Sequence, residues 1–369
     1  MNILVTGAKG FIGKNLVLFL KNEGYETVFE YDIDSPREKL GEYCEKCDFV
    51  FNLAGVNRPK EESEFMEGNF GFASALLDTL EKAGNKCPVM VSSSTQAALD
   101  NPYGRSKLAG ENLMREYSER TGAPVYIYRF PNVFGKWCRP NYNSAVATFC
   151  NNIACGLPIK VNDPSTELTL VYIDDILKEM LRAIKGEPTK DGDICVVPVT
   201  HKATLGRITE LLYSFRDSRE TLSVANQSDE FEKKLYATYL SYLPTDKFSY
   251  PLNMHCDNRG SFTEIIRTAE RGQFSVNISK PGITKGNHWH NTKNEKFLVV
   301  SGKAAIRFRK PDSEEIIEYI VSGDELTVVD IPTGYTHSIE NIGEGDLVTF
   351  MWANECFDPQ NPDTIYLEV

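Results

Sequence analysis

The 369-residue sequence lacks any apolar run long enough to cross a membrane as a helix, and it lacks an excess of basic residues. Its 40 Lys and Arg stand against 52 Asp and Glu, so the net charge of −12 offers no basic field for a phosphate backbone. We therefore expect neither membrane insertion nor a nucleic-acid partner. The N-terminus also lacks the basic segment and cleavage site of a signal peptide, which predicts a cytoplasmic protein.

The cysteines form no disulfide framework. There are nine, an odd number without regular spacing, which is typical of a reducing compartment. Cys44 and Cys47 have C-x-x-C spacing, but no second pair or histidine follows nearby, so the sequence favours incidental thiols over a zinc site. With 41% hydrophobic and 11% aromatic residues, the chain has enough apolar material for two globular cores.

Two patterns of secondary structure divide the sequence. From Met1 to about Ile184, apolar strand-like runs alternate with helical patterns, which predicts a Rossmann-type, doubly wound parallel sheet of the α/β class. Beyond about residue 245, short β-rich segments separated by Gly, Asn, Asp and Pro predict an all-β barrel. We expect a domain boundary there, with an α/β domain over 1–245 and a barrel over 246–369.

A glycine-rich turn follows the first strand-like run. The sequence TGAKGFIG comes after NILV and before the helical GKNLVLFL. Glycines at this spacing allow a tight turn and close backbone approach, and the helix N-terminus offers N–H groups to a pyrophosphate. The turn therefore predicts a dinucleotide site at Gly7, Gly10, Phe11, Ile12 and Gly13.

Two residues bear on the choice of cofactor. Asp32, at the end of the next strand, is placed to hold a ribose 2′-OH, as in NADH enzymes. Arg37 is placed to hold the 2′-phosphate of NADPH. We expect NADPH, because biosynthetic reductases usually draw on it, and keep NADH as the alternative.

Further segments carry a family resemblance. Besides the glycine turn, they are NLAG at 52–55, Asn69, Y-x-x-x-K at 103–107, RFPNVFG at 129–135 and VYIDD at 171–175. Together they resemble the extended, nucleotide-sugar branch of the short-chain dehydrogenase/reductase family. The resemblance implies a UDP-sugar substrate, a homodimer, cofactor contacts at Ala54, Gly55, Asn69, Tyr103 and Lys107, and substrate contacts at Asn132 and Arg139. Arg139 can also be read as an ordinary surface arginine.

The spacing of Tyr103 and Lys107 has a chemical reason. Residues four apart on a helix share a face, so the lysine is expected to lower the pKa of the tyrosine, which then acts as general acid toward a carbonyl oxygen. A hydroxyl should hold the same oxygen. The candidates are Ser92, Ser93, Ser94 and Thr95, and the family resemblance favours Ser94.

Histidines concentrate in the second half. Three of the five in the chain are His288, His290 and His337, and Glu295 stands five residues after the second. Alternate residues of a strand face the same way, so His288 and His290 should point together into the barrel. These segments resemble the two motifs of the cupin family, with Gly323 misplaced in the second motif. Three histidines and a carboxylate suit zinc or another divalent metal.

A metal-free interpretation is also open. The stretches from Asp257 to Glu264, from Lys285 to His288 and from Ile331 to His337 resemble the metal-free 3,5-epimerases of deoxysugar biosynthesis, in which the histidine matching His288 is a base. His290 and Glu295 favour a metal without excluding that basic role.

The order of the two domains resembles a family of bifunctional enzymes of bacterial capsular polysaccharide synthesis. It implies that the cupin epimerises C3 of a UDP-4-keto-6-deoxy-N-acetylhexosamine. The first domain would then reduce C4, giving UDP-2-acetamido-2,6-dideoxy-L-talose, a precursor of UDP-N-acetyl-L-fucosamine. One alternative is a 4-ketoreductase with a structural or sugar-sensing cupin. A non-catalytic dinucleotide sensor is disfavoured by the intact Tyr103 and Lys107 pair.

Overall fold

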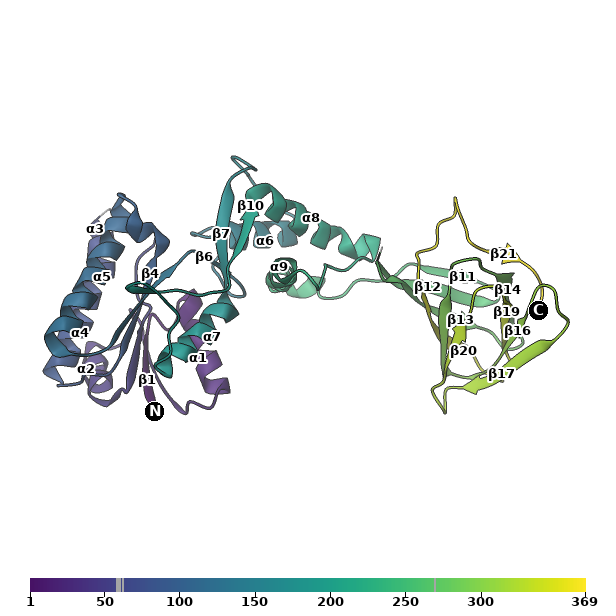
Figure 1. The fold of residues 1–369 in the computed structure, drawn as a ribbon, viewed down its shortest axis with the longest axis horizontal. Helices are drawn as coiled ribbons and strands as arrows, with labels where there is room; N and C mark the ends of the chain where they lie inside the picture. Colours follow the sequence, from purple (N-terminus) through teal and green to yellow (C-terminus); the bar gives the residue numbers. More distant parts are fainter. Residues whose placement is uncertain (58–60, 62, 269) are drawn as a thin grey trace. The chain divides into compact units, whose positions relative to one another are not determined.

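The computed structural model describes residues 1–57, 61, 63–268 and 270–369. The chain divides into two compact units, labelled along the chain in Figure 1: Met1–Tyr213 with Gln227–Pro244, and Ser214–Asn226 with Thr245–Val369. The second division lies one residue from the expected boundary, but Ser214–Asn226 groups with the barrel. The Arg267 N–H donates to the Leu222 carbonyl at 2.8 Å, a tertiary contact that helical periodicity does not encode.

The first unit is built on a seven-stranded sheet in the order β2-β1-β3-β4-β5-β9-β8, in which the first five strands are parallel. Its strands are β1 (Asn2–Thr6), β2 (Thr27–Tyr31), β3 (Phe49–Asn52), β4 (Val89–Ser94), β5 (Val125–Phe130), β8 (Lys190–Asp191) and β9 (Ile194–Cys195). The order in which strands are added reverses at β1, because β2 lies on one side of β1 and β3 on the other. In open α/β sheets, ligands bind at the carboxyl ends of strands at such a switch point.

Helices cover both faces of this sheet. One core packs α1 (Phe11–Asn22) and α7 (Ile173–Ile184) on alternate strand residues such as Ile3 and Phe51. The other packs α2 (Arg37–Lys46), α4 (Phe72–Lys82) and α5 (Pro102–Thr121) on the opposite residues, such as Leu4 and Val50. Cys44, Cys47 and Cys87 lie in this second core as free thiols.

A three-stranded sheet of order β10-β7-β6 completes the first unit, with β6 (Asn132–Phe134), β7 (Glu167–Tyr172) and β10 (His201–Thr204). The remaining helical segments are α3 (Ser63–Met66), the π-helix η1 (Glu67–Gly71), the 3₁₀ turn η2 (Thr95–Ala98), α6 (Ala145–Cys155) and α9 (Glu230–Leu240). Helix α8 (Leu205–Thr221) runs from this unit into the second.

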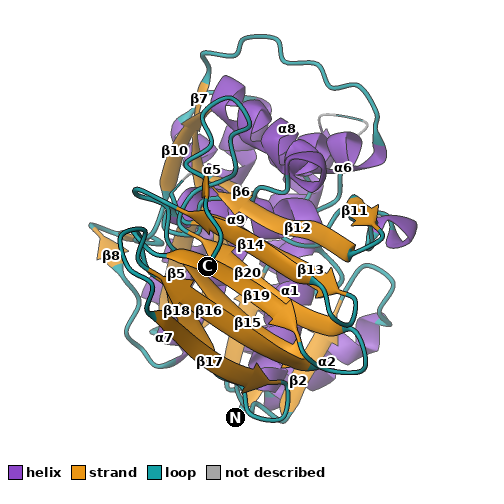
Figure 2. Cartoon of the chain, turned by 90° about the vertical axis from the view of Figure 1, so that its right-hand side faces the viewer, coloured by secondary structure: helices purple, strands orange, loops and turns teal. Residues whose placement is uncertain are grey.

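The second unit consists of two antiparallel sheets, seen as orange arrows in Figure 2. One has the order β11-β12-β13-β20-β15-β18 and the other β17-β16-β19-β14-β21. The elements are η3 (Thr245–Lys247), β11 (Met254–Asp257), β12 (Gly260–Thr268), β13 (Gly272–Ser279), β14 (Thr284–Trp289), β15 (Glu295–Ser301), β16 (Lys303–Arg309), β17 (Ile316–Ser322), β18 (Val328–Ile331), β19 (Thr336–Asn341), β20 (Leu347–Ala353) and β21 (Ile365–Tyr366). An apolar core that includes Phe297, Ile306 and Ile339 lies between the sheets.

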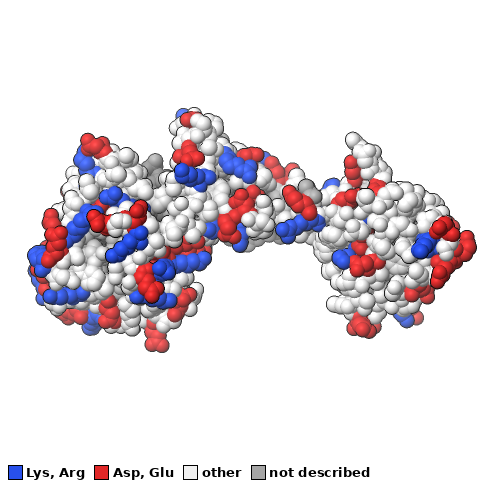
Figure 3. Space-filling model, in the orientation of Figure 1, with Lys and Arg blue, Asp and Glu red and all other residues white. Residues whose placement is uncertain are grey.

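The surface carries both signs of charge. In the view of Figure 3, Lys and Arg are interspersed with Asp and Glu, without a continuous basic stripe. Among the described helices, none has the length and apolar content that a membrane span requires.

Candidate functional site

The glycine turn lies at the switch point of the first sheet. Gly7 has φ +65°, and a Cβ there would lie 2.8 Å from the Ala54 nitrogen. A Cβ on Gly13 would lie 2.1 Å from the Gly7 oxygen. Helix α1 begins at Phe11, and no side chain caps it at Gly10. The close backbone packing therefore requires glycine at positions 7 and 13. The start of the helix offers unsatisfied N–H groups to an anion.

Asp32 lies beside this turn. Its Oδ2 accepts a hydrogen bond from the Lys9 backbone N–H at 2.7 Å, which joins the end of β2 to the glycine turn. Arg37 is exposed at the start of α2. Sequence reasoning missed Lys9, whose exposed ammonium pairs with Asp34. The signal for it was a lysine inside the glycine motif. The assignment of Asp32 and Arg37 to the cofactor remains a prediction.

The NLAG segment after β3 meets Asn69 and Lys107. A Cβ on Gly55 would lie 2.7 Å from Asn69 Oδ1 and 3.3 Å from Lys107 Nζ, so glycine lets both side chains approach the backbone. Asn69 sits in the π-helix η1, where its amide donates to the Val56 carbonyl and to the Ser106 hydroxyl. π-helical turns frequently occur at functional sites.

The structure brings Ser94, Tyr103 and Lys107 together. Ser94 ends β4, and its hydroxyl forms a hydrogen bond with Tyr103 near the start of α5. Lys107 Nζ lies 5.7 Å from the centre of the Tyr103 ring. The Ser93 hydroxyl instead donates to Glu111 at 2.6 Å. Ser93 therefore contacts Glu111, whereas Ser94 is the serine that contacts the tyrosine.

The direction predicted for the Tyr103 pKa is wrong for the free protein. Burial raises the pKa of Tyr103, and the hydrogen bond with Ser94 offsets only part of that effect. Burial also lowers the pKa of Lys107 to about 8, opposed by the charge of Glu111. The sequence showed that the two residues share a helix face but not how deeply they are buried.

A buried ion-pair network lies next to this site, and it was not predicted from the sequence. The Glu111 side chain is inaccessible to solvent, and its carboxylate accepts hydrogen bonds from Arg129 at 2.8 and 2.7 Å. Burial alone would raise the pKa of Glu111, but the bonds from Arg129 and Ser93 hold it below its usual range. The network fixes the strand end that carries Ser92, Ser93 and Ser94.

The two residues expected to contact substrate lie in the same unit. Asn132 is exposed on β6 and donates to the Thr169 carbonyl at 3.2 Å. The Arg139 guanidinium is also exposed and lies over the Tyr142 ring, 5.3 Å from its centre. Both assignments to substrate remain predictions.

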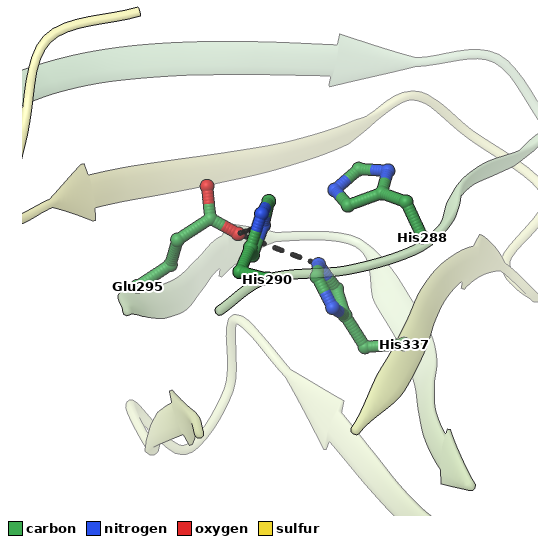
Figure 4. Close-up of side chains that lie close together, drawn as sticks. All are labelled: His288, His290, Glu295 and His337. Carbon is green, nitrogen blue, oxygen red and sulfur yellow. Dashed lines mark ion pairs between the residues drawn. The ribbon is translucent and has the colours of Figure 1, made fainter. Parts of the chain in front are cut away.

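In the second unit, His288, His290, Glu295 and His337 point toward one another, as Figure 4 shows. They come from β14, the residue after it, β15 and β19, and one potential ligand atom from each lies within 4.8 Å of the others. Glu295 Oε2 is 3.5 Å from His290 Nε2 and 3.3 Å from His337 Nε2. The predicted set is therefore assembled from both sheets of the barrel, the histidines from the paired strands β14 and β19 and the residue after β14, and Glu295 from β15 of the other sheet.

The polar atoms of this cluster fit a divalent cation. His290 Nδ1 hydrogen-bonds the Asp363 backbone carbonyl, so Nδ1 carries the proton and Nε2 turns a lone pair toward Glu295 Oε2. Among the residues that the structure describes, neither of these buried atoms has a hydrogen-bond partner. Two acceptors facing each other away from water need a cation between them, and three imidazoles with a carboxylate are a zinc-type donor set.

The charge states suit metal binding as well. Burial and the neighbouring histidines lower the pKa of His288 to about 4, so its ring is neutral at neutral pH. Burial alone would raise the pKa of Glu295, but it is held well below its usual range, and the Lys293 ammonium is the fixed positive charge beside it. Lys293 Nζ lies 3.2 Å from Glu295 Oε1, which leaves Oε2 for the histidine side.

One wall of the barrel interior is polar. On β13 the buried positions are Gln273, Ser275, Asn277 and Ser279, whereas the apolar residues between them are only half-buried. Two buried hydroxyls, Thr263 Oγ1 and Thr349 Oγ1, have no hydrogen-bond partner within the described part of the chain. Such a wall resembles the lining of a cavity for a polar ligand more than an apolar core.

Comparison with known proteins agrees with this architecture. Residues 3–197 match the model of the NAD dependent epimerase/dehydratase family, and residues 255–365 match that of the polysaccharide biosynthesis C-terminal domain. The crystal structure of the capsular polysaccharide assembling protein CapF from Staphylococcus aureus is 57% identical, with a TM-score of 0.95 and full coverage of both chains. The chain is a member of the two-domain, CapF-type branch of the NAD dependent epimerase/dehydratase family.

Two other similarities complete the comparison. A UDP-2-acetamido-2,6-beta-L-arabino-hexul-4-ose reductase from Pseudomonas aeruginosa is 44% identical over 99% of this chain and 98% of its own length. A UDP-glucuronic acid 4-epimerase from Bacillus cereus is 20% identical over 66% of this chain and 96% of its own, with a TM-score of 0.55, a likeness of fold alone. The predicted Rossmann-type domain followed by an all-β, cupin-like domain is thus confirmed.

Proposed function

We propose that this CapF-type chain is a bifunctional nucleotide-sugar enzyme. Its second unit epimerises C3 of a UDP-4-keto-6-deoxy-N-acetylhexosamine, and its first unit then reduces C4 with NADPH to give UDP-2-acetamido-2,6-dideoxy-L-talose. The observation that carries the reductase half is the grouping of Ser94, Tyr103 and Lys107 beside the glycine turn. The name of the 44% identical Pseudomonas relative, a UDP-hexul-4-ose reductase, supports the substrate class.

The reductase residues have defined tasks. A nicotinamide, when bound, would supply the hydride for this reduction. Tyr103 donates its phenolic proton to the C4 oxygen, and the Ser94 hydroxyl holds that oxygen in place. Because burial keeps the pKa of Tyr103 above its ordinary value, the phenol is protonated at neutral pH, as a proton donor for reduction must be.

NADPH is favoured by the charges around the ribose position. Lys9 and Arg37 are two cations close in sequence to the glycine turn and to Asp32, and both are exposed. We assign them to the 2′-phosphate. The test compares the reduction rate with NADPH and with NADH. Removing both Lys9 and Arg37 should reduce the preference for NADPH over NADH.

In the barrel, we assign the metal to His290, Glu295 and His337, with His288 as the fourth ligand. A divalent ion bound there would supply positive charge to the ketone oxygen. The neutral ring of His288 is also placed to accept the C3 proton, and the pKa of about 4 keeps it unprotonated for either role. On the polar wall, the buried hydroxyls of Thr263 and Thr349 offer hydrogen-bonding groups to a sugar.

The chemistry sets the order of the two steps. A C3 hydrogen is acidic only while C4 is a ketone, so epimerisation must precede reduction. We further propose that the enzyme works as a cytoplasmic homodimer, as the resemblance to the extended branch implies.

The test uses the full chain, the UDP-4-keto sugar and either NADPH or NADH. Absorbance follows oxidation of the nicotinamide, and NMR gives the product configuration at C3 and C4. The proposal expects reduction at C4 with inversion at C3. Reduction without change at C3 would leave the barrel with a structural or sugar-sensing role.

A further inference from the structure

The C-terminal segment contacts the metal-ligand cluster from the edge of the sheet that carries β14. Strand β21 pairs with β14, with Tyr366 opposite His288 and Ile365 opposite Trp289. The Leu367 N–H donates to the Asn287 carbonyl at 3.0 Å. Two residues before β21 stands Asp363, so this pairing fixes its position next to the end of β14.

Asp363 makes two different contacts with the same loop. Its backbone carbonyl is the partner of His290 Nδ1. Its carboxylate accepts the backbone N–H groups of Asn291, Thr292 and Lys293, at 2.7 to 3.0 Å. Three successive backbone donors on one carboxylate form an anion-binding turn, and they hold the pKa of Asp363 well below its usual range.

The loop that Asp363 holds joins two of the assigned ligands. It begins at His290 and ends at Glu295, the first residue of β15. Its other end is tied as well, because the Asn294 N–H donates to Asn354 Oδ1 at 3.0 Å. The distance and direction between His290 Nε2 and Glu295 Oε2 therefore depend on how this four-residue connection is held.

We propose that Asp363 is a positioning residue for the metal site: its carbonyl fixes the tautomer and ring direction of His290, and its carboxylate fixes the loop that sets Glu295 against it. A histidine ligand commonly donates its second N–H to such a partner, and loss of the partner costs 10- to 100-fold in metal affinity. This inference rests on the metal site proposed above. It adds a residue that lies 73 positions after His290 in the sequence.

Asp363→Asn in the full chain is the test, because the amide replaces one acceptor oxygen with a donor that faces N–H groups. Asp358→Asn is the matched control, since Asp358 lies in the same segment and accepts from Gln360 and Asn361 of its own turn. Zinc affinity is measured by competition with a chelator, and the geometry of the site by the visible spectrum of the cobalt-substituted protein. NADPH binding by the first unit reports that the rest of the chain is folded.

If Asp363 positions the ligands, Asp363→Asn lowers zinc affinity 10- to 100-fold and changes the cobalt spectrum. Asp358→Asn changes neither. If the variant is unstable without metal, the spectrum at saturating cobalt still decides, because saturation restores the folded state but not the ligand geometry. An unchanged spectrum at saturation, with only a lower melting temperature, overturns the proposal. Wild-type protein that binds no zinc overturns the metal site itself and this inference with it, whereas wild-type binding with an unaffected variant overturns the inference alone.

Discussion

Lys107 Nζ donates a hydrogen bond to the Ser92 carbonyl at 3.1 Å, so the lysine of the Y-x-x-x-K motif is tied to the strand end that carries the serines. The same ammonium lies 5.7 Å from the Tyr103 ring centre. Helix α5 and strand β4 thus hold the buried Lys107 ammonium between Tyr103 and the end of β4.

Tyr103→Phe removes the phenolic proton while keeping the ring that packs against Phe65. We expect NADPH binding to persist and the rate of C4 reduction to fall by about 10²- to 10⁴-fold, the weight of a positioned general acid. Tyr25→Phe, at a half-buried position on the opposite side of the sheet, is the control. Turnover close to the wild-type rate in Tyr103→Phe would remove the tyrosine from the mechanism.

Lys107→Met tests the cost of burying the ammonium. The folded pKa of Lys107 is about 8, below its ordinary value of 10.5, so between those values the unfolded chain binds the extra proton. The cost of burial is therefore full below about pH 8 and is relieved as the pH rises toward 10.5. We expect the variant to be more stable than wild type at pH 7, by up to about 3 kcal/mol, yet inactive as a reductase. Denaturant unfolding at pH 7 and pH 10 should show the difference shrinking, and a constant or growing difference would contradict the assignment.

Glu111→Gln breaks the buried ion pair with Arg129. The pKa of Glu111 is lowered in the folded protein, so its contribution is present above the unfolded pKa and is lost as the pH falls through the folded one. We expect about 2–4 kcal/mol lower stability at pH 7 and a much smaller difference near pH 3. Glu116→Gln, on the exposed face of the same helix, should change little. Equal effects of the two substitutions would mean that the network is not stabilising.

Metal content follows from the unpartnered atoms of His290 and Glu295. Elemental analysis of the wild-type protein should find about one divalent ion per chain, and His290→Ala should lose it. His255→Ala, an exposed histidine on β11, is the matched control. Protein that contains no metal and is indifferent to chelators would favour the metal-free epimerase interpretation.

The sequence predicted those parts of the structure that depend on local pattern. The glycine turn, the helical spacing of Tyr103 and Lys107 and the alternation of His288 and His290 each follow from one element and its period, and the structure places them as expected. What sequence reasoning missed depends on contacts between distant segments. The ion pair of Glu111 with Arg129 spans 18 residues, and the clamp of Asp363 on the loop after His290 spans about 70.

The sequence pattern also could not predict how deeply individual side chains are buried. The expected fall in the pKa of Tyr103 assumed a solvated lysine beside it, whereas desolvation dominates both residues. The grouping of Ser214–Asn226 with the barrel has a similar origin, because a regular helix pattern does not reveal which core its last turn joins.

The central claim is that the two units perform separate steps, epimerisation in the barrel and reduction at Tyr103. The most direct measurement is deuterium incorporation at C3 in D₂O, read by NMR on the UDP-4-keto sugar with Tyr103→Phe and with His290→Ala. The account predicts that Tyr103→Phe still places deuterium at C3 while failing to reduce C4, and that His290→Ala loses C3 exchange while its NADPH binding is intact. Exchange at C3 that disappears with Tyr103 and survives loss of His290 would contradict it, assigning both steps to the first unit.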